Sequence, residues 1–322
     1  MHIPDGFLDT KTAAATAVLS LCGVGYALRR VRRELPPRRI PLLGLAAAFL
    51  FVAQMVNFPV LAGTSGHLVG GVLVAALLGP SAAVVVVTTV LVVQCFLFGD
   101  GGITALGANV FNMAIVDSVS GYAIYRATSG IVPGLRGRIA AVAFAGWCST
   151  LIASITCAGE LAWSGTVSWQ AAFSAMAGVH MLIGVGEGLI SALVYLGIAR
   201  TRPDLAARSP APDIPGAAGD LVVYGLVISL GIAGLVVPFA CPWPDGLERV
   251  AQRLGFAQQA ASPPASTPAA GYLFPGIRSA AAATAVAGLV GAALVFVLAL
   301  ALGYLLAPRE SRASAESGSN PP

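Results

Sequence analysis

Charged residues are scarce in this 322-residue sequence: they make up 10% of the chain, whereas 57% of its residues are hydrophobic. Soluble globular domains carry roughly a quarter charged residues, which argues against a water-soluble enzyme or nucleic-acid binder. The sequence also has a single lysine, Lys11, in DTKTAAA. A phosphate-binding P-loop needs a lysine inside a glycine-rich turn, so the chain is not itself an ATPase of that class. The composition instead predicts an integral membrane protein.

Two further features are missing. The five cysteines form no CxxC pair and four of them lie in apolar runs, where a free cysteine behaves as a small hydrophobe. We therefore expect neither disulfides nor a cysteine metal site. The start MHIPDGFLDTK has no basic segment and no small-residue cleavage site, so no secretory signal is predicted and Met1 is expected to remain the first residue.

Apolar runs long enough to cross about 30 Å of hydrocarbon recur along the chain. We predict an all-α, polytopic membrane helix bundle with spans at residues 12–28, 41–57, 81–98, 104–125, 139–159, 171–199, 220–240 and 280–306. A shorter run, 67–79, ends at Gly79-Pro80. Its length fits a re-entrant or core helix better than an independent crossing.

The arginines predict how the bundle is oriented. Alternating the loops across the membrane places 14 of the 18 basic residues on one side, in clusters at 29–39, 126–138, 200–208 and 309–312. Because cytoplasmic loops carry the excess of Lys and Arg, we expect an outside N-terminus and a cytoplasmic C-terminus in a bacterial inner membrane. The same alternation requires an even number of passes over 67–98, so Gly79-Pro80 should be a turn.

Composition also divides the chain. Residues 1–205 contain six predicted long spans and the short helix, and 220–307 contain two more spans around an outside segment. Between them, 206–219 is rich in Pro and Ala and is predicted to be a linker. The polar tail, 308–322, is predicted to be disordered.

Ionisable and amide side chains within the spans are few, and such residues are costly in a membrane and usually functional. Asn109, Asn112 and Asp117 lie in GANVFNMAIVDSVSG, where hydrogen bonding between helices and a functional role are equally supported. His180 and Glu187, in HMLIGVGEG, lie on one helix face. For these two, a mutual or cross-helix pair that stabilises the bundle is favoured over direct metal ligation.

The first two residues offer a chelating set of nitrogens. A free α-amine on Met1, the amide nitrogen of His2 and its imidazole Nδ1 can close fused rings on one metal ion, in a planar geometry that suits Ni(II) or Cu(II). His67 follows a flexible turn in GTSGHLVGG and can supply a fourth nitrogen. A histidine at position two is a weak signal alone. The signal becomes stronger because a second histidine, His67, follows a flexible turn and because the N-terminus is expected outside the membrane.

Four motifs, MHIPDGFL, GTSGHLVGG, GANVFNM and HMLIGVGEG, resemble the CbiM/NikM family. These are the substrate-binding membrane components of energy-coupling-factor nickel and cobalt transporters, and the resemblance covers residues 1–205. It implies that the Met1 amine, the His2 amide and imidazole nitrogens, and the His67 imidazole bind the metal in a square-planar set. The supporting candidates around these ligands are Asn109, Asn112, Asp117, His180 and Glu187.

The second part of the chain carries its own signature. PDGLE, residues 244–248, lies between the last two spans and resembles the small auxiliary subunit of the same transporters, here fused to the binding component. Asp245 and Glu248 have capping-box spacing at the start of a short amphipathic helix. We expect a packed outer helix without direct metal contact.

The resemblance implies a transport component rather than an enzyme. Ni²⁺ or Co²⁺ would be captured outside the cell and delivered inward, with nickel favoured by the planar nitrogen set and by the PDGLE module. ATP hydrolysis would take place in separate ATPase subunits, joined through a membrane coupling subunit. No organic cofactor and no nucleic-acid partner is expected.

Two alternatives remain. In a secondary transporter driven by an ion gradient, Asp117 and Glu187 would relay protons. An intramembrane metallohydrolase would use His67, His180 and Glu187, with Asp117 orienting them, and would need a nucleophilic water on an open metal position. The sequence contains neither HExxH nor GxSxG, so the hydrolase is the less favoured of the two.

Overall fold

The structure is a computed structural model of the chain, and it describes residues 1–61, 63–206 and 217–307. Most of the predicted linker, 206–219, and the whole of the predicted tail, 308–322, lie outside the described residues. Helices dominate the described parts, and a single small sheet is found among them.

Seven helices of the described residues are long and apolar enough to cross a membrane, which confirms a polytopic helical protein. Three of them include a short continuation: η1 (Pro37–Arg39) leads into α2, the π-helical η2 (Gln94–Phe98) extends α4, and the 3₁₀ turn η4 (Val237–Phe239) follows α9. The helices are α1 (Thr10–Glu34), α2 (Ile40–Met55), α4 (Pro80–Val93), α7 (Gly134–Trp163), α8 (Trp169–Thr201), α9 (Ala217–Leu235) and α11 (Ala280–Leu306).

The run predicted as a span at 104–125 has a more complex structure and is not among these seven. It comprises α5 (Leu106–Asn109), the π-helical η3 (Val110–Val116) and α6 (Asp117–Thr128). Its two asparagines and its aspartate are all buried inside the bundle, and these polar side chains interrupt the apolar run. A π-helical segment commonly marks a functional region of a helix.

The short helix α3 (Gly71–Leu78) and α4 form a hairpin. Gly79 joins them with φ 93°, a backbone conformation that side chains disfavour, so the predicted turn at Gly79-Pro80 is present. His67, just before α3, lies next to Met1, and Gln94, at the end of α4, lies next to His2. Both ends of the hairpin therefore lie beside the first two residues of the chain.

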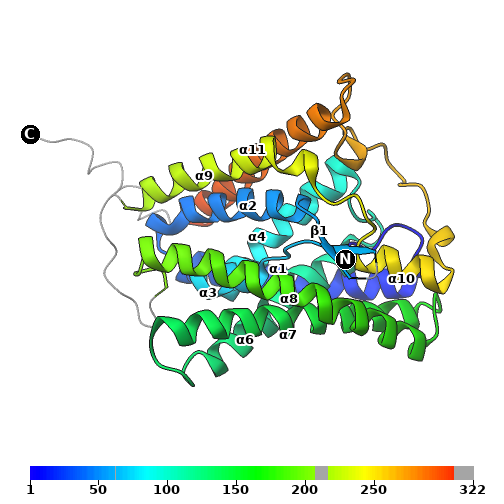
Figure 1. Cartoon of the computed structure of the whole chain (residues 1–322), viewed down its shortest axis with the longest axis horizontal. Helices are drawn as coiled ribbons and strands as arrows, with labels where there is room; N and C mark the ends of the chain where they lie inside the picture. Colours follow the sequence, from blue (N-terminus) through cyan, green and yellow to red (C-terminus); the bar gives the residue numbers. More distant parts are fainter. Residues whose placement is uncertain (62, 207–216, 308–322) are drawn as a thin grey trace, which may run out of the picture.

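The last two long helices pack on the rest of the bundle. Both α9 and α11 contact α2, and glycines allow close approach: a Cβ on Gly44 would lie 3.0 Å from the carbonyl oxygen of Phe296. On the opposite side α6 and α7 run together, and α7 packs along α8, where a Cβ on Gly146 would lie 3.1 Å from the Cα of Gly188. Figure 1 shows both layers.

Between the second and third helices, β1 (Phe58–Val60) pairs antiparallel with β2 (Thr64–Gly66). The short helix α10 (Gly246–Leu254) contacts β2 and α8. Figure 1 shows the N-terminus beside β1 and α10. Two further 3₁₀ turns complete the described elements: η5 (Ala257–Gln259) and η6 (Ala270–Tyr272).

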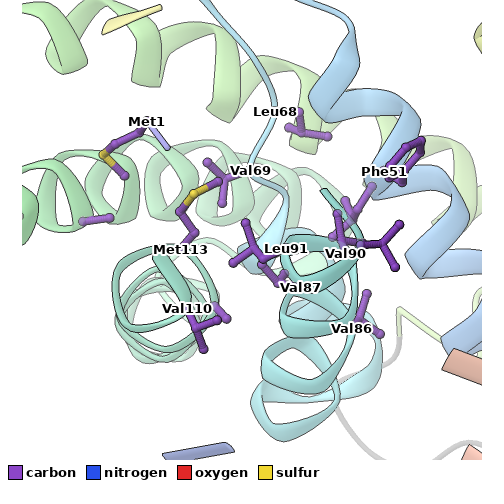
Figure 2. Close-up of a cluster of buried hydrophobic side chains, with 14 of the residues drawn as sticks. Met1, Phe51, Leu68, Val69, Val86, Val87, Val90, Leu91, Val110 and Met113 are labelled. Atoms are coloured by element: carbon purple, nitrogen blue, oxygen red, sulfur yellow. The ribbon is translucent and has the colours of Figure 1, made fainter. Parts of the chain in front are cut away.

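The core reaches from the middle of the bundle to the first residue. Figure 2 shows Leu91 and its neighbours on α4 between Phe51 of α2 and Met113 of η3, with Met1 at one side of the cluster. Met1, Ile3 and Phe7 are all buried. Burying such a side chain contributes roughly 1.5–3 kcal/mol, so the apolar side chains of the N-terminal tail hold it inside the protein.

Candidate metal centre

The N-terminal tail is fixed through its backbone. The side chain of Asn109 binds both backbone groups of Ile3. Its Oδ1 accepts from the Ile3 amide at 2.7 Å, and its Nδ2 donates to the Ile3 carbonyl at 3.0 Å. The Ile3 carbonyl also accepts from the amide of Gly102 at 2.8 Å. Ile3 is thus held in one place, and the two residues before it are positioned with it.

The bend that follows is locked by a buried carboxylate. Asp5 accepts hydrogen bonds from the amides of Ile103 and Thr104 at 3.1 and 2.7 Å and from the Thr104 hydroxyl. Gly6 has φ 90°, and a Cβ there would collide with the carbonyl oxygen of Gln259. A Pro-Asp-Gly triplet favours such a bend, but the local sequence does not show which segment Asp5 binds.

The α-amine of Met1 lies buried between two side chains. It is 3.2 Å from Nε2 of His67 and 2.6 Å from Oδ2 of Asp245. Burial opposes the charged form of the amine, but the attraction and hydrogen bond of Asp245 outweigh it and raise the pKa of the amine. Burial likewise opposes the Asp245 carboxylate, and the amine more than compensates, so the pKa of Asp245 falls below its usual range.

The imidazole of His2 stacks on that of His67, with ring centroids 5.5 Å apart and ring planes 26° apart. Nδ1 of His2 lies 3.2 Å from Oδ1 of Asp100, and Nε2 lies 3.2 Å from Oε1 of Gln94. Burial lowers the pKa of His2 and, more strongly, that of His67. Both rings are therefore favoured in the neutral form that binds metal ions.

His67 follows β2 directly, and β2 is tied to the segment that carries Asp245. The amide of Ser65 donates to the carbonyl of Pro244 at 2.8 Å, and its hydroxyl donates to the carbonyl of Trp243 at 2.8 Å. Nδ1 of His67 has no hydrogen-bond partner among the described residues. One nitrogen of this imidazole thus faces the amine, while the other makes no hydrogen bond.

The other two candidates from α8, His180 and Glu187, bind different parts of the structure. Glu187 accepts from the amides of Val69 and Gly70 at 2.6 and 2.9 Å, just after His67. His180 lines a small pocket with Met1, His67 and Asp245, and its Nδ1 donates to the Met176 carbonyl at 2.9 Å. His180 and Glu187 therefore have different partners and do not pair with each other.

Asn112 and Asp117 have other partners than Asn109. Asn112 donates to Oε2 of Glu160 at 2.7 Å, and Asp117 lies against Gly71 at the start of α3. Glu160 was not singled out in the sequence, although an acid among the apolar residues at the end of α7 is a readable signal.

The outer helix agrees only partly with expectation. The capping box is present, since Asp245 Oδ1 accepts from the Glu248 amide at 2.8 Å and Glu248 Oε2 accepts from the Asp245 amide at 3.0 Å. Asp245, however, also reaches the Met1 amine, so α10 begins at the site rather than away from it. Gln94 and Asp100 are further site residues that the sequence pattern did not single out.

Within the residues that the structure describes, there is no group of three or more His, Cys, Asp or Glu side chains arranged to hold a metal ion. The nitrogens that do converge are the Met1 amine, the adjacent backbone and two imidazoles. Chelation here would therefore depend on main-chain nitrogens. These donors suit tetragonal metal ions better than the oxygen-seeking Mg²⁺ or Ca²⁺.

Two family profiles match the chain. Residues 2–205 match the family described as the cobalt uptake substrate-specific transmembrane region, and residues 219–308 match the PDGLE domain. A putative fused nickel transport protein, NikMN, of Archaeoglobus fulgidus is 37% identical over 306 residues, which cover 94% of this chain and 98% of that protein.

A fused nickel transport protein, NikMN, of Rhodobacter capsulatus is 33% identical over 331 residues, and the aligned region covers 95% of this chain and 92% of that protein. Among solved structures, the crystal structure of a truncated transition metal transporter superposes with a TM-score of 0.57 at 31% identity. That match covers 62% of this chain and 99% of the solved one.

Proposed function

Because the chain belongs to the cobalt-uptake substrate-specific transmembrane family, fused here to a PDGLE domain, we propose that it captures nickel, or cobalt, outside the cell for inward transport. Proteins of this family are transport components, so the chain is not an enzyme and the hydrolase alternative is set aside. The proposal treats residues 1–205 as the metal-binding bundle, 206–219 as a linker and 220–307 as the auxiliary module.

The observation that carries this proposal is the 3.2 Å approach of the Met1 amine to Nε2 of His67 inside the bundle. With the His2 amide nitrogen and imidazole, these atoms make four nitrogen donors. A metal ion bound by the Met1 amine and by the amide and imidazole nitrogens of His2 closes fused rings with the tail, and the His67 imidazole completes the plane. Such a planar nitrogen set favours nickel over cobalt as the substrate.

Capture requires several groups to change partners. The amine must give up its proton and its contact with Asp245, and the amide of His2 must lose its hydrogen. Nδ1 of His2, the donor atom expected from chelate geometry, faces Asp100, so the imidazole must exchange this carboxylate for the metal. Asn109 keeps its two hydrogen bonds to Ile3 throughout and so anchors the tail while the first two residues rearrange.

The energy source lies outside this chain in the proposal. A membrane coupling subunit and ATPase subunits of the energy-coupling-factor type would drive release toward the cytoplasm. The orientation is supported by the arginine clusters: α1 starts next to the site-bearing tail and carries Arg32 and Arg33 in its last turn, about 34 Å along the helix. With these arginines in the cytoplasm, the Met1 site faces outward.

Adding one glycine before Met1 tests the ligand assignment. The extension moves the amine away from the His2 chelate, so the affinity of the purified protein for Ni²⁺ should fall at least about tenfold while the protein still unfolds in a cooperative thermal transition. A matched control inserts one glycine after the exposed Ile131, at the α6–α7 turn. Equal Ni²⁺ affinity in the extended and unmodified proteins would remove the amine from the site.

Uptake assays separate the proposal from a gradient-driven transporter. In cells that express this chain with or without the coupling and ATPase subunits, ATP-dependent ⁶³Ni uptake is expected only with the partners. Uptake by this chain alone that follows an imposed proton gradient, and that is lost in Asp117→Asn or Glu187→Gln variants, would favour the secondary transporter.

A further inference from the structure

Two buried carboxyl groups converge on the segment that follows His67. Glu187, from the middle of α8, is fully buried and accepts hydrogen bonds from the amides of Val69 and Gly70 at 2.6 and 2.9 Å. These amides immediately precede α3, whose first turn carries unpaired N–H groups and a partial positive charge. Bonds of this length, directed at a helix start, fit an ionised carboxylate.

Asp117 approaches the same segment from the other side. It is fully buried at the start of α6, and a Cβ on Gly71 would collide with its Oδ2. Its carboxyl group lies against the Gly71 amide and the Ser149 hydroxyl without completing a hydrogen bond to either. Residues 69–71 are thus held between one carboxyl group with two good hydrogen bonds and another with none.

Among the residues that the structure describes, no cation compensates the two carboxyl groups. α3 contains no ionisable residue, and the charged group of the described residues that faces Glu187 is Asp117 itself. Beside Asp117 lie Ser149 and the amide of Gly71, neither of which carries a charge. Two carboxylates in a buried site without a cation repel each other strongly, and such pairs retain a proton.

We propose that Asp117 binds one proton beside an ionised Glu187, and that this carboxyl pair positions the His67 segment for metal binding. Glu187 is a positioning residue, since it acts through the backbone two and three residues after His67. The proton on Asp117 removes the repulsion that would otherwise push the two helices and the clamped segment apart. The positioning role rests on the proposed metal site, whereas the proton site does not.

Infrared spectroscopy tests the proton site without any metal. At neutral pH, the difference spectrum between the wild-type protein and an Asp117→Asn variant should show the loss of one protonated-carboxyl band. Glu160→Gln, which alters a buried carboxyl group paired with Asn112, serves as the matched control and should leave that band in place. Loss of a carboxylate band in Asp117→Asn, or no change in the protonated-carboxyl region, would overturn the proposal.

Nickel binding tests the positioning role. Glu160→Gln, the same control as above, should leave the affinity within about twofold of wild type. Glu187→Gln replaces an acceptor of two amide hydrogens by a group with one acceptor oxygen, and should weaken Ni²⁺ binding at least about tenfold. Its bound-nickel absorption spectrum should also shift, because His67 leaves the metal plane.

A second variant distinguishes the positioning role from a general loss of stability in Glu187→Gln. Gly71→Ala pushes Asp117 Oδ2 and Ser118 Oγ away from the segment but alters neither carboxyl group chemically, and it should shift the same nickel spectrum. Wild-type nickel spectra in both Glu187→Gln and Gly71→Ala would overturn the positioning role. A wild-type protein that does not bind nickel would instead refute the proposed function, with the infrared result unaffected.

Discussion

The α-amine of Met1 and the carboxylate of Asp245 lie 2.6 Å apart, although the two residues are 244 positions apart in the sequence. The same carboxylate caps α10 through its other oxygen, which accepts from the Glu248 amide. The PDGLE domain therefore contacts the atom that would bind the metal in the proposed site. A metal ion bound to the amine would break this ion pair, so the proposed site would couple metal capture to the position of α10.

Replacing Asp245 by Asn should strengthen nickel binding near neutral pH. Asp245 raises the pKa of the amine, so a proton competes with the metal for this nitrogen. Without the carboxylate, burial remains and favours the neutral amine, and the pH at which binding is half-maximal should move downward. Ni²⁺ titrations over a pH series measure this shift.

The control for this variant is Glu248→Gln, which alters the capping box but keeps Asp245 beside the amine. Its pH dependence should match that of the wild-type protein. Weaker binding in Asp245→Asn at all pH values would mean that the carboxylate assists the metal site rather than competing with it.

Nickel binding by the wild-type protein should weaken as the pH falls. The pKa of the amine is raised, so its proton must be displaced over the whole acidic and neutral range, together with the amide proton of His2. The two imidazoles have lowered pKa values because of burial, so they add competition only at lower pH. Release of about two protons per nickel ion, measured in weakly buffered solution, is expected near neutral pH. Release of none would exclude both main-chain ligands.

Replacing His67 by Ala should lower nickel affinity at least about tenfold and change the absorption spectrum of the bound metal, because one of four nitrogens is lost. His180→Ala is the matched control, since His180 lines the same pocket but its Nδ1 donates to the Met176 carbonyl. Similar losses in the two variants would show that the effect comes from the pocket and not from a ligand.

The long helices could be predicted from the sequence because each is an uninterrupted apolar run of sufficient length. The hairpin turn at Gly79 was also predictable, since a Gly-Pro pair ends one run and starts the next. The π-helical segment at Val110–Val116 was not, because it depends on how η3 packs against its neighbours and leaves no mark on hydrophobic periodicity.

At the site, the tail and His67 were visible in local motifs, but their surroundings were not. Asp245 reaches Met1 only through the packing of two distant parts of the chain, which no local pattern encodes. His180 and Glu187 share a helix face, yet seven residues separate them by about 10 Å along the axis, too far for a mutual pair. Glu187 instead found backbone partners from a loop that folds against α8.

Two asparagines three residues apart offer a matched pair for testing the anchor of the tail. Asn109→Ala removes both side-chain hydrogen bonds to the Ile3 backbone and leaves a buried amide and carbonyl with fewer partners, at a cost of about 1–3 kcal/mol. Asn112→Ala removes a buried hydrogen bond of similar length, but to Glu160. Hydrogen exchange at residues 2–6 should therefore quicken in Asn109→Ala and stay slow in Asn112→Ala. Nickel affinity should follow the same order, because a loosened tail must first be ordered before its nitrogens can surround the metal. Equal exchange in the two variants would mean that the buried side chains of Met1, Ile3 and Phe7 hold the tail without Asn109.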